Sequence, residues 1–278
     1  MYRLPVSSSR SSSAPDISTI IATYRRPQTL IEAIESVLAQ TGPAIEVIVV
    51  DDDPQRSAEP VVKQFDGKVI YLPMPSWSQK RPALVRNTGW QQASGKYIHF
   101  LDDDDRVPPG TYQAVFNALE SKPDAGMAFG VVEPFGDDEE ILEYQREYFA
   151  NAAKRARMAQ RFGSRRLMVA NMLFKPTVLV NSACMIRREC VANLGGFDTE
   201  CVVVEDVDFY IRAIRNFGFV FLDRVVLNYR TGAPSLMTDL NNNRPVVNSY
   251  DRIYENYRKR FGAAELLLLK IMTRIFLR

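Results

Sequence analysis

The stretch GKYIHFLDDDD, residues 95–105, combines a short apolar run with four consecutive aspartates. Residues 95–101 suit a buried strand, and the strand delivers the carboxyl groups at its end. Like charges this close repel one another. A bound Mg²⁺ or Mn²⁺ would remove the repulsion, because hard cations take carboxylate oxygens and share their other positions with phosphates and water. The stretch therefore predicts a metal–phosphate site. A solvated acidic turn that caps the next helix is the alternative.

Strands and helices alternate around this stretch. We expect strands at residues 17–22, 45–50, 68–72 and 125–132, with helices at 27–42, 59–65, 82–93 and 111–121 between them. This alternation indicates βαβ units and a parallel sheet with helices on both faces. Three strands end in polar motifs, and ligands of such sheets bind at the carboxyl ends of strands. We therefore expect the three motifs to meet in space.

The second half of the chain is less regular. It predicts a charged helix at residues 139–166, a strand at 177–187, a helix starting near 205, and strand-like runs at 219–222 and 225–229. We expect a flexible Ser-rich tail at 1–15 and one domain at 16–232, with a nucleotide-binding half (16–106) and an acceptor-side half (107–232). Residues 233–278 form a C-terminal extension that carries a basic amphipathic helix.

Composition narrows the function classes. Lys and Arg number 35 against 33 Asp and Glu, so the chain has no basic field and no nucleic-acid partner is expected. The 3 cysteines lack metal or disulfide spacing and indicate a reducing compartment. Without a span of membrane-crossing length, a cytoplasmic protein is expected. The helix at 263–278 could lie on the inner membrane face as a peripheral contact, pack on its own domain, or form a homodimer.

Four ordered motifs identify a family resemblance: TYRRP (23–27), VIVVDDD (47–53), RNTGWQQASGKYIHFLDDDD (86–105), and GGFD with VVVEDVDFYIRA (195–213). Together they resemble inverting nucleotide-sugar glycosyltransferases of the family-2 type, over roughly residues 16–229. The resemblance implies an α/β fold of the GT-A class, which is Rossmann-like, with a mostly parallel central sheet flanked by helices and here a C-terminal helical extension. It also implies a UDP-sugar donor.

The resemblance assigns the acidic quartet to the metal. Asp104 is expected to be a direct ligand of Mn²⁺ or Mg²⁺, together with Asp102, since a spacing of two turns side chains to the same side of an extended segment. Asp102 and Asp103 would also face the metal's waters or the ribose. Asp105 is expected to cap the following turn. A metal in this place would act as a Lewis acid on the departing diphosphate.

The resemblance also implies the nucleotide contacts. Asp52 would accept the uracil N3–H, with helix capping as the alternative. Tyr24 would stack on the base or serve as a core aromatic, and the Thr23 hydroxyl would help to hold the nucleotide. Arg81 and Arg86 lie in a segment beside the base and phosphates, where guanidinium groups suit phosphate oxygens. Arg86 could equally be a structural link.

A second acidic motif supplies the catalytic base. In the resembled family the second carboxylate of the pair Glu205-Asp206 takes the proton of the acceptor hydroxyl, so Asp206 is assigned that role and Glu205 is the second candidate. A capped helix start is the alternative reading of this pair. Gly196 and Phe197 are expected to shape the acceptor side.

Two departures from the family pattern stand out. Many relatives carry a histidine after the Tyr-Arg pair of the last core strand, but here Tyr229-Arg230 is followed by Thr231. His99, the only histidine of the chain, lies inside a strand and is expected to be a packed residue. The pair Arg25-Arg26 replaces a more usual polar residue.

The expected function is transfer of a hexose or N-acetylhexosamine from a UDP-sugar to a hydroxyl of a glycan or lipid-linked saccharide, in surface polysaccharide or glycolipid synthesis. A sugar-nucleotide nucleotidyltransferase is the enzymatic alternative, but residues 22–27 contain no glycine for a phosphate loop. A non-catalytic nucleotide- or glycan-binding module is the other alternative. Retention of Asp206 and of the metal aspartates argues against it.

Overall fold

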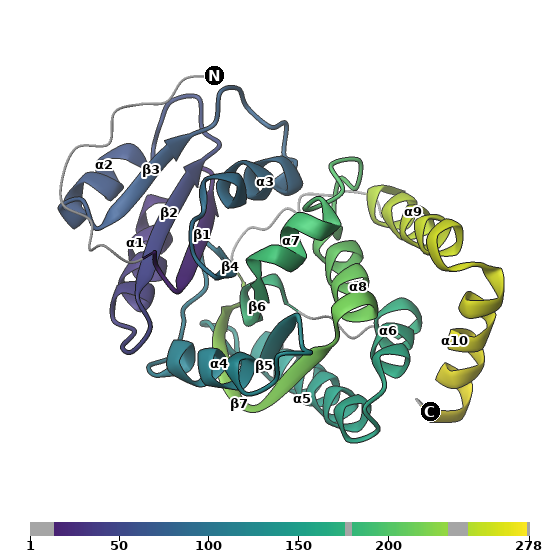
Figure 1. The fold of residues 1–278 in the computed structure, drawn as a ribbon. Helices are drawn as coiled ribbons and strands as arrows, with labels where there is room; N and C mark the ends of the chain where they lie inside the picture. The colour runs from purple at the N-terminus through teal and green to yellow at the C-terminus, as the bar shows by residue number, and fades with distance from the viewer. Residues whose placement is uncertain (1–13, 176–179, 233–243, 277–278) are drawn as a thin grey trace.

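The computed structural model describes residues 14–175, 180–232 and 244–276, and within these ranges seven strands form one sheet (Figure 1). The strands are β1 (Ile17–Thr23), β2 (Ile45–Asp51), β3 (Val69–Pro73), β4 (Tyr97–Asp102), β5 (Met127–Phe135), β6 (Cys184–Arg187) and β7 (Phe219–Arg230). The helices are α1 (Pro27–Leu38), α2 (Glu59–Val62), α3 (Pro82–Gln92), α4 (Thr111–Glu120), α5 (Glu139–Arg161), α6 (Arg165–Phe174), α7 (Arg188–Leu194), α8 (Glu205–Phe217), α9 (Arg244–Phe261) and α10 (Ala263–Phe276), with 3₁₀ turns η1 (Lys63–Phe65) and η2 (Asn181–Ala183).

The strand order is β3-β2-β1-β4-β6-β5-β7. Strands β1 to β4 pair in parallel, and so do β5 and β7, whereas β6 runs antiparallel to both of its neighbours. The α/β prediction with a mostly parallel sheet is therefore confirmed. The register aligns Thr23 with Asp51 and Ala22 with Asp102. The carboxyl ends of the three motif-bearing strands are flush, as the sequence predicted.

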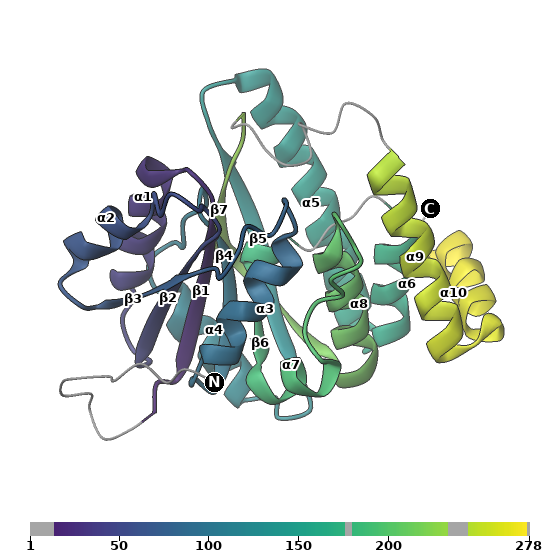
Figure 2. The same cartoon turned by 90° about the horizontal axis from the view of Figure 1, so that it is seen from above.

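Helices cover both faces of the sheet (Figure 2). Ile17 and Ile21 of β1 pack with α1, α2 and α4, while Ile20, on the opposite face, packs with α3, α8 and the helices behind it. Because both faces are buried, the central strands read as continuous apolar runs. Pro27 and Pro82 occupy the first turn of α1 and α3, where a missing N–H costs nothing.

Two predicted elements are divided differently in the structure. The helix expected at 139–166 is two helices, because Gly163 adopts a left-handed conformation (φ 58°) between α5 and α6. The runs 219–222 and 225–229 are one strand, β7. In the pairing with β5, Gly130 lies opposite Leu222 and the next residue, Val131, lies opposite Val225. Residues 223–224 of β7 therefore form a bulge.

The strand predicted at 177–187 is mostly wrong. Residues 176–179 lie outside the described residues, and only β6 is a strand. Residues 181–183 form η2 instead, because Asn181 and Ser182 turn their polar side chains toward β4: Asn181 Nδ2 donates to the Phe100 carbonyl at 3.1 Å, and the backbone N–H of Asp102 donates to Ser182 Oγ at 3.0 Å.

The C-terminal extension contains two helices where one was predicted. The expected helix at 263–278 corresponds to α10, whose buried Thr273 Oγ1 donates to the Leu269 carbonyl at 2.9 Å as α10 packs on α6. Helix α9 precedes it and was not predicted. In the part of the chain that the structure describes, every helix is too short or too polar to cross a membrane.

Candidate active site

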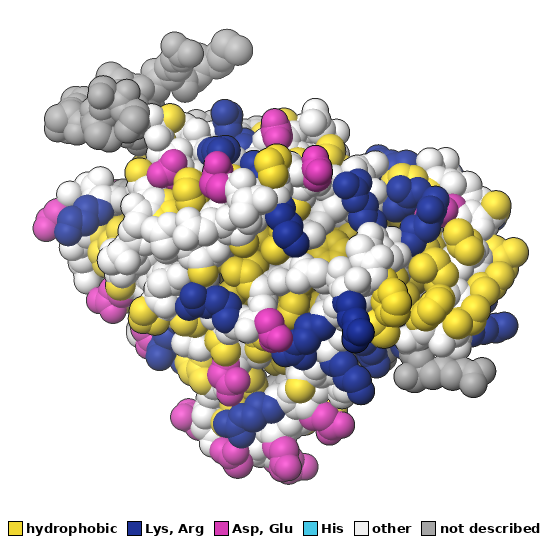
Figure 3. Space-filling model, turned by 60° about the horizontal axis from the view of Figure 1, so that its bottom comes forward, with side chains coloured by type: hydrophobic (Ala, Val, Ile, Leu, Met, Phe, Trp, Pro, Cys, Tyr) yellow, Lys and Arg dark blue, Asp and Glu magenta, His cyan; other side chains and the backbone are white. Residues whose placement is uncertain are grey.

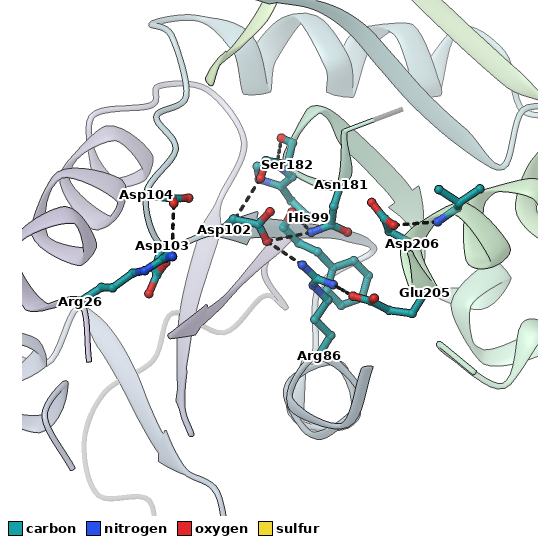
Figure 4. A network of polar contacts seen from close by, with 12 residues as sticks. Arg26, Arg86, His99, Asp102, Asp103, Asp104, Asn181, Ser182, Glu205 and Asp206 are labelled. Carbon is teal, nitrogen blue, oxygen red and sulfur yellow. Dashed lines mark hydrogen bonds and ion pairs between the residues drawn. The ribbon is translucent and has the colours of Figure 1, made fainter. Parts of the chain in front are cut away.

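The acidic quartet lies where β4 ends and a turn begins. Asp102 is the last strand residue, and Asp103 and Asp104 belong to the turn. The two-residue alternation of a strand therefore does not extend to Asp104, and the prediction that Asp102 and Asp104 point to the same side is wrong. Figure 4 shows Asp102 directed toward Arg86 and Asp104 toward Arg26.

Arg26 connects the first motif to the acidic turn. Its Nη1 donates to Asp103 Oδ1 at 3.1 Å and to Asp104 Oδ2 at 2.8 Å. The Thr23 hydroxyl donates to Asp103 Oδ2 at 2.7 Å, so Thr23 orients a carboxylate of the site. Arg26, the second arginine of TYRRP, therefore forms ion pairs across the sheet edge. The flush ends of β1 and β4 make these contacts possible.

Burial makes ionisation of the carboxyl groups in this turn unfavourable. Desolvation, with the neighbouring charge of Asp104, raises the pKa of Asp103 to about 7 although Arg26 opposes the shift. Desolvation and the charge of Asp102 also raise the pKa of Asp104. The charges of Arg26 and Arg230 lower the pKa of Asp104 but do not offset desolvation, so the turn favours the approach of a further cation.

Asp105 has a different role from the one predicted. It is buried, and its Oδ1 accepts the backbone N–H of Arg230 at 3.0 Å, so it ties the turn to the end of β7. The Arg230 side chain returns to the same turn, since its Nε donates to the Asp104 carbonyl at 2.9 Å. Arg230, which precedes the position where relatives have a histidine, therefore fixes the backbone of the acidic turn.

Arg86 is a structural link rather than an open phosphate contact. It is buried, its Nη2 donates to Asp102 Oδ1 at 2.7 Å, and its Nη1 forms an ion pair with Glu205. Asn181 Nδ2 also reaches Asp102 Oδ1, at 3.3 Å. The contacts join α3, β4 and α8, and they occupy Glu205, the second candidate for the catalytic base.

Asp206 is the carboxylate that this network leaves without a cation. Among the described residues, no Lys or Arg forms an ion pair with it, and its Oδ1 accepts its neighbour's backbone N–H, that of Val207, at 2.8 Å. Part of the residue is accessible, but protein surrounds the carboxylate. Desolvation, together with the charge of Glu205, raises the pKa of Asp206 to about 7. A carboxylate whose pKa lies near neutrality, in a residue that is partly accessible, suits a general base.

The backbone before Asp206 is strained. Val204 precedes the first turn of α8 with φ 52°, a left-handed conformation that β-branched residues rarely adopt. Such strain is concentrated at functional sites, where the surroundings hold it in place. Here it starts α8 so that Glu205 points to Arg86 while Asp206 does not (Figure 4).

The predicted nucleotide contacts lie at the neighbouring strand ends. Asp52 is buried, and both of its carboxylate oxygens accept from Ser78, from the backbone N–H at 2.7 Å and from the hydroxyl at 2.6 Å. Burial raises the pKa of Asp52. Arg81 is the residue before α3, and no ion pair to its side chain is formed within the described ranges. Its guanidinium is therefore available to a ligand.

An aromatic pair lies beside these residues. The Tyr24 ring is stacked with Trp77, with centroids 6.5 Å apart and planes inclined by 24°. Trp77 is 44% exposed, which is unusual for so large an apolar side chain. Trp77 and Ser78 were missed in the sequence, because they lie in a polar loop with no helical or strand periodicity. In the sequence, the one signal that could have identified them as site residues is a tryptophan within a polar loop.

Gly196 and Phe197 pack inward instead of facing the site. The Phe197 ring is buried against Phe100 and Phe209, with centroids 4.8 and 4.3 Å away. Gly196 has φ 77°, and a Cβ there would meet Asn87 Oδ1 at 2.4 Å. His99 is a packed residue, as predicted: its ring nitrogens contact the Tyr112 hydroxyl and the Ser182 carbonyl, both at 2.7 Å.

The protein alone does not complete a metal site. The described residues contain no group of three or more His, Cys, Asp or Glu side chains placed to hold a metal ion. However, the Asp102 and Asp104 side chains keep 33% and 17% of their surface accessible. One or two carboxylates with substrate phosphates and water satisfy Mg²⁺ and similar cations. The donor set therefore fits a cation that is shared with a diphosphate.

Comparisons with known proteins identify the family. The profile described as glycosyl transferase family 2 matches residues 18–195. An uncharacterized glycosyltransferase of Methanocaldococcus jannaschii is 27% identical over 222 residues, 78% of this chain and 71% of that protein. The minor teichoic acid biosynthesis protein GgaB of Bacillus subtilis is 26% identical over 216 residues, 74% of this chain and 22% of that protein.

Solved structures share the fold. S. aureus TarS in complex with UDP-GlcNAc has a TM-score of 0.62 and 18% identity, and the match covers 82% of this chain. The chain spans only 62% of that structure, and 37% of a longer TarS structure. The matched profile covers more than half of the chain, from β1 to the end of α7. The chain therefore belongs to glycosyl transferase family 2.

Proposed function

We propose that the chain is a metal-dependent, inverting glycosyltransferase that moves a hexose or N-acetylhexosamine from a UDP-sugar to a hydroxyl of a glycan or lipid-linked saccharide. One observation carries the proposal: the carboxylates near the end of β4 are separate from a further carboxylate on α8. Asp102 ends β4 and Asp104 lies in the turn that follows, and each is bound to an arginine. Asp206 lies on the other side of Arg86, and no Lys or Arg of the described residues pairs with it. A relative in structure binds UDP-GlcNAc, which supports the donor class.

Asp206 would take the proton from the acceptor hydroxyl. The hydroxyl oxygen then forms a bond to the anomeric carbon of the sugar while the bond from that carbon to the diphosphate oxygen breaks, and UDP leaves with the electron pair. Attack from the side opposite the diphosphate inverts the configuration. A raised pKa makes Asp206 a stronger base than an ordinary aspartate, which favours this proton transfer.

Asp104 would be the direct ligand of the divalent cation, Mn²⁺ or Mg²⁺, and Asp102, whose side chain points toward Arg86, would contact the cation through its waters. When bound, the cation would supply Lewis-acid neutralisation of the departing diphosphate. Arg26 and Arg230 remain as protein groups around the turn: Arg26 neutralises part of the charge of Asp103 and Asp104, and Arg230 fixes the turn's backbone.

The nucleotide would bind over the ends of β1 and β2. Asp52 keeps a second lone pair on each oxygen for the uracil N3–H while Ser78 holds the carboxylate in place. Tyr24 and Trp77 offer an aromatic surface to the base, and Arg81 offers its guanidinium to the phosphates.

The first prediction concerns the aromatic surface. Base–aromatic stacking contributes about 1–3 kcal/mol, so Trp77→Ala should weaken UDP binding by roughly 5- to 150-fold in calorimetry. Tyr144→Ala is the matched control, because Tyr144 is an aromatic residue of α5 with 67% exposure. Equal UDP affinity of Trp77→Ala and wild type would exclude Trp77 from the nucleotide site.

The second prediction concerns the base. Asp206→Asn should lower UDP release from a UDP-sugar in the presence of acceptor by roughly 100-fold or more, since the amide cannot accept the proton. UDP affinity should be unchanged. The melting temperature should be equal or higher, because the change removes a buried charge whose ionisation opposes folding above the unfolded-state pKa.

The pH dependence has a defined sign. The base acts in its deprotonated form, so kcat/KM of the wild type should fall as pH drops below about 7 and level off above it. Asp206→Asn should lose this dependence. Retained turnover in Asp206→Asn would contradict the assignment, and release of pyrophosphate instead of UDP would indicate a nucleotidyltransferase.

A surface-polysaccharide role on the cytoplasmic membrane face is supported by the teichoic acid relative and by α10. The outward face of α10 carries Leu267, Leu268, Ile271 and Ile275, each at least 42% exposed. Lys270 and Arg274 flank this stripe, and Figure 3 shows apolar side chains gathered at that edge with Lys and Arg groups beside them. This pattern suits an anionic lipid surface.

The third prediction tests that contact by vesicle flotation. The protein should bind vesicles with phosphatidylglycerol more than pure phosphatidylcholine vesicles, and Leu267→Gln with Ile271→Gln should remove the binding. Ile141→Gln, on α5, is the control for loss of an exposed apolar residue. A protein that forms a dimer through α10 and ignores the vesicles would contradict the membrane contact.

A further inference from the structure

A cavity of about 470 Å³ is lined by residues of α8, of α9 and of the segment 194–198. Figures 1 and 2 show where α8 and α9 lie in the fold. This size is within the range of small-molecule sites. Helix α8 contributes Asp208, Ile211 and Arg212 to its wall. Asp206 precedes Asp208 by two residues and thus lies roughly 200° around the helix, so the cavity is separate from the proposed catalytic face.

The inner part of the cavity is electrically balanced. Arg212 Nε donates to Asp208 Oδ2 at 2.6 Å, and its other nitrogens donate to the carbonyls of Leu194 and Gly196. Arg252 Nε pairs with Asp198 Oδ2 at 2.9 Å. Each arginine is therefore neutralised by one aspartate, and neither pair contributes net charge.

The rim of the cavity carries excess positive charge. Lys259 and Arg260, in the last turn of α9, both line it. Among the residues that the structure describes, Lys259 pairs with Glu255 alone, one turn earlier on the exposed surface, and such exposed pairs contribute little. Arg260 forms no ion pair within the ranges that the structure describes. Two cations are therefore available to an anion at the rim.

The remaining lining offers apolar and backbone surface to a carbon skeleton. Ile211, Ile253 and Phe261 line the cavity. Gly195 has φ 74°, and a Cβ at this position would meet no atom within 4 Å, so open space adjoins its backbone. An anionic group beside a small polyhydroxylated skeleton would match this combination of cationic rim, apolar wall and exposed peptide groups.

The cavity is connected to the active site through one short segment. Phe197, which lines it, donates its backbone N–H to Asn87 Oδ1 at 2.9 Å, and its carbonyl accepts from Asn87 Nδ2 at 2.9 Å. Asn87 follows Arg86, which holds Asp102 and Glu205. The wall of the cavity is thus joined through this segment to Arg86 and to the two carboxylates that Arg86 holds.

We propose that this cavity binds a phosphate-bearing sugar or polyol unit of the acceptor, away from the hydroxyl that receives the transferred sugar. The inference rests on the proposed function and makes the acceptor an anionic saccharide. The predicted acceptor-side residues Gly196 and Phe197 would then act from this cavity, whose wall they form, and not from the donor side.

The test is an NMR titration of the full chain with sn-glycerol 3-phosphate, with glycerol and inorganic phosphate as separate arms. The wild type should bind sn-glycerol 3-phosphate, should bind inorganic phosphate more weakly, and should not bind glycerol. The double variant Lys259→Gln, Arg260→Gln should weaken binding of sn-glycerol 3-phosphate by about tenfold or more. Arg258→Gln is the matched control, because Arg258 is exposed on α9 but does not line the cavity.

Three outcomes would overturn the inference. These are no binding by the wild type, equal binding by the double variant, and inorganic phosphate binding as tightly as sn-glycerol 3-phosphate, which would mark a simple anion site. The titration needs no donor and no turnover, so its failure is distinct from failure of the proposed function. The double variant should keep the wild-type melting temperature and UDP affinity, since its residues lie behind α8.

Discussion

An imbalance of charge at the end of β4 organises this molecule. Six carboxyl groups lie at the end of β4, in the turn that follows and at the start of α8: those of Asp102, Asp103, Asp104, Asp105, Glu205 and Asp206. Two guanidinium groups form ion pairs with four of them, Arg26 with Asp103 and Asp104, and Arg86 with Asp102 and Glu205. The surrounding fold holds these groups together against their repulsion. The flush ends of β1 and β4 bring Arg26 across, α3 brings Arg86, and the end of β7 fixes the turn through Arg230. This excess of carboxyl groups is the physical basis for the proposal that a divalent cation, shared with the donor diphosphate, binds here.

The first half of the fold could be predicted from the sequence, because its strands are buried on both faces and its helices begin at prolines. The second half could not be predicted in detail. Strand β6 has only four residues and runs antiparallel, and its preceding turn is shaped by contacts of Asn181 and Ser182 with a strand about eighty residues earlier. The bulge in β7 depends on its pairing with β5, and the break at Gly163 depends on a single left-handed residue. Tertiary contacts of this kind leave no periodic signal in a local window.

The same distinction applies to the site. Motif order was enough to predict that Thr23, Asp52 and Asp102 meet at one edge of the sheet. Asp206 comes from the first turn of α8. The sequence favoured Arg81 over Arg86 as a ligand contact but gave no physical reason for the order. Burial and ion-pair partners supply the reason, because they make Arg86 a structural link. The choice of Asp206 over Glu205 rested on the resemblance alone, and the structure adds a physical reason: Arg86 occupies Glu205. The expected alternation of Asp102 and Asp104 failed because the strand ends between them.

We propose that the acidic turn needs a divalent cation in order to bind the diphosphate. The direct measurement is the calorimetric affinity for UDP with and without Mn²⁺, for the wild type and for Asp104→Asn. We expect Mn²⁺ to strengthen UDP binding to the wild type by about tenfold or more, and we expect Asp104→Asn to lose this gain. An equal UDP affinity of the wild type with and without Mn²⁺, or a gain that is unchanged in Asp104→Asn, would contradict it.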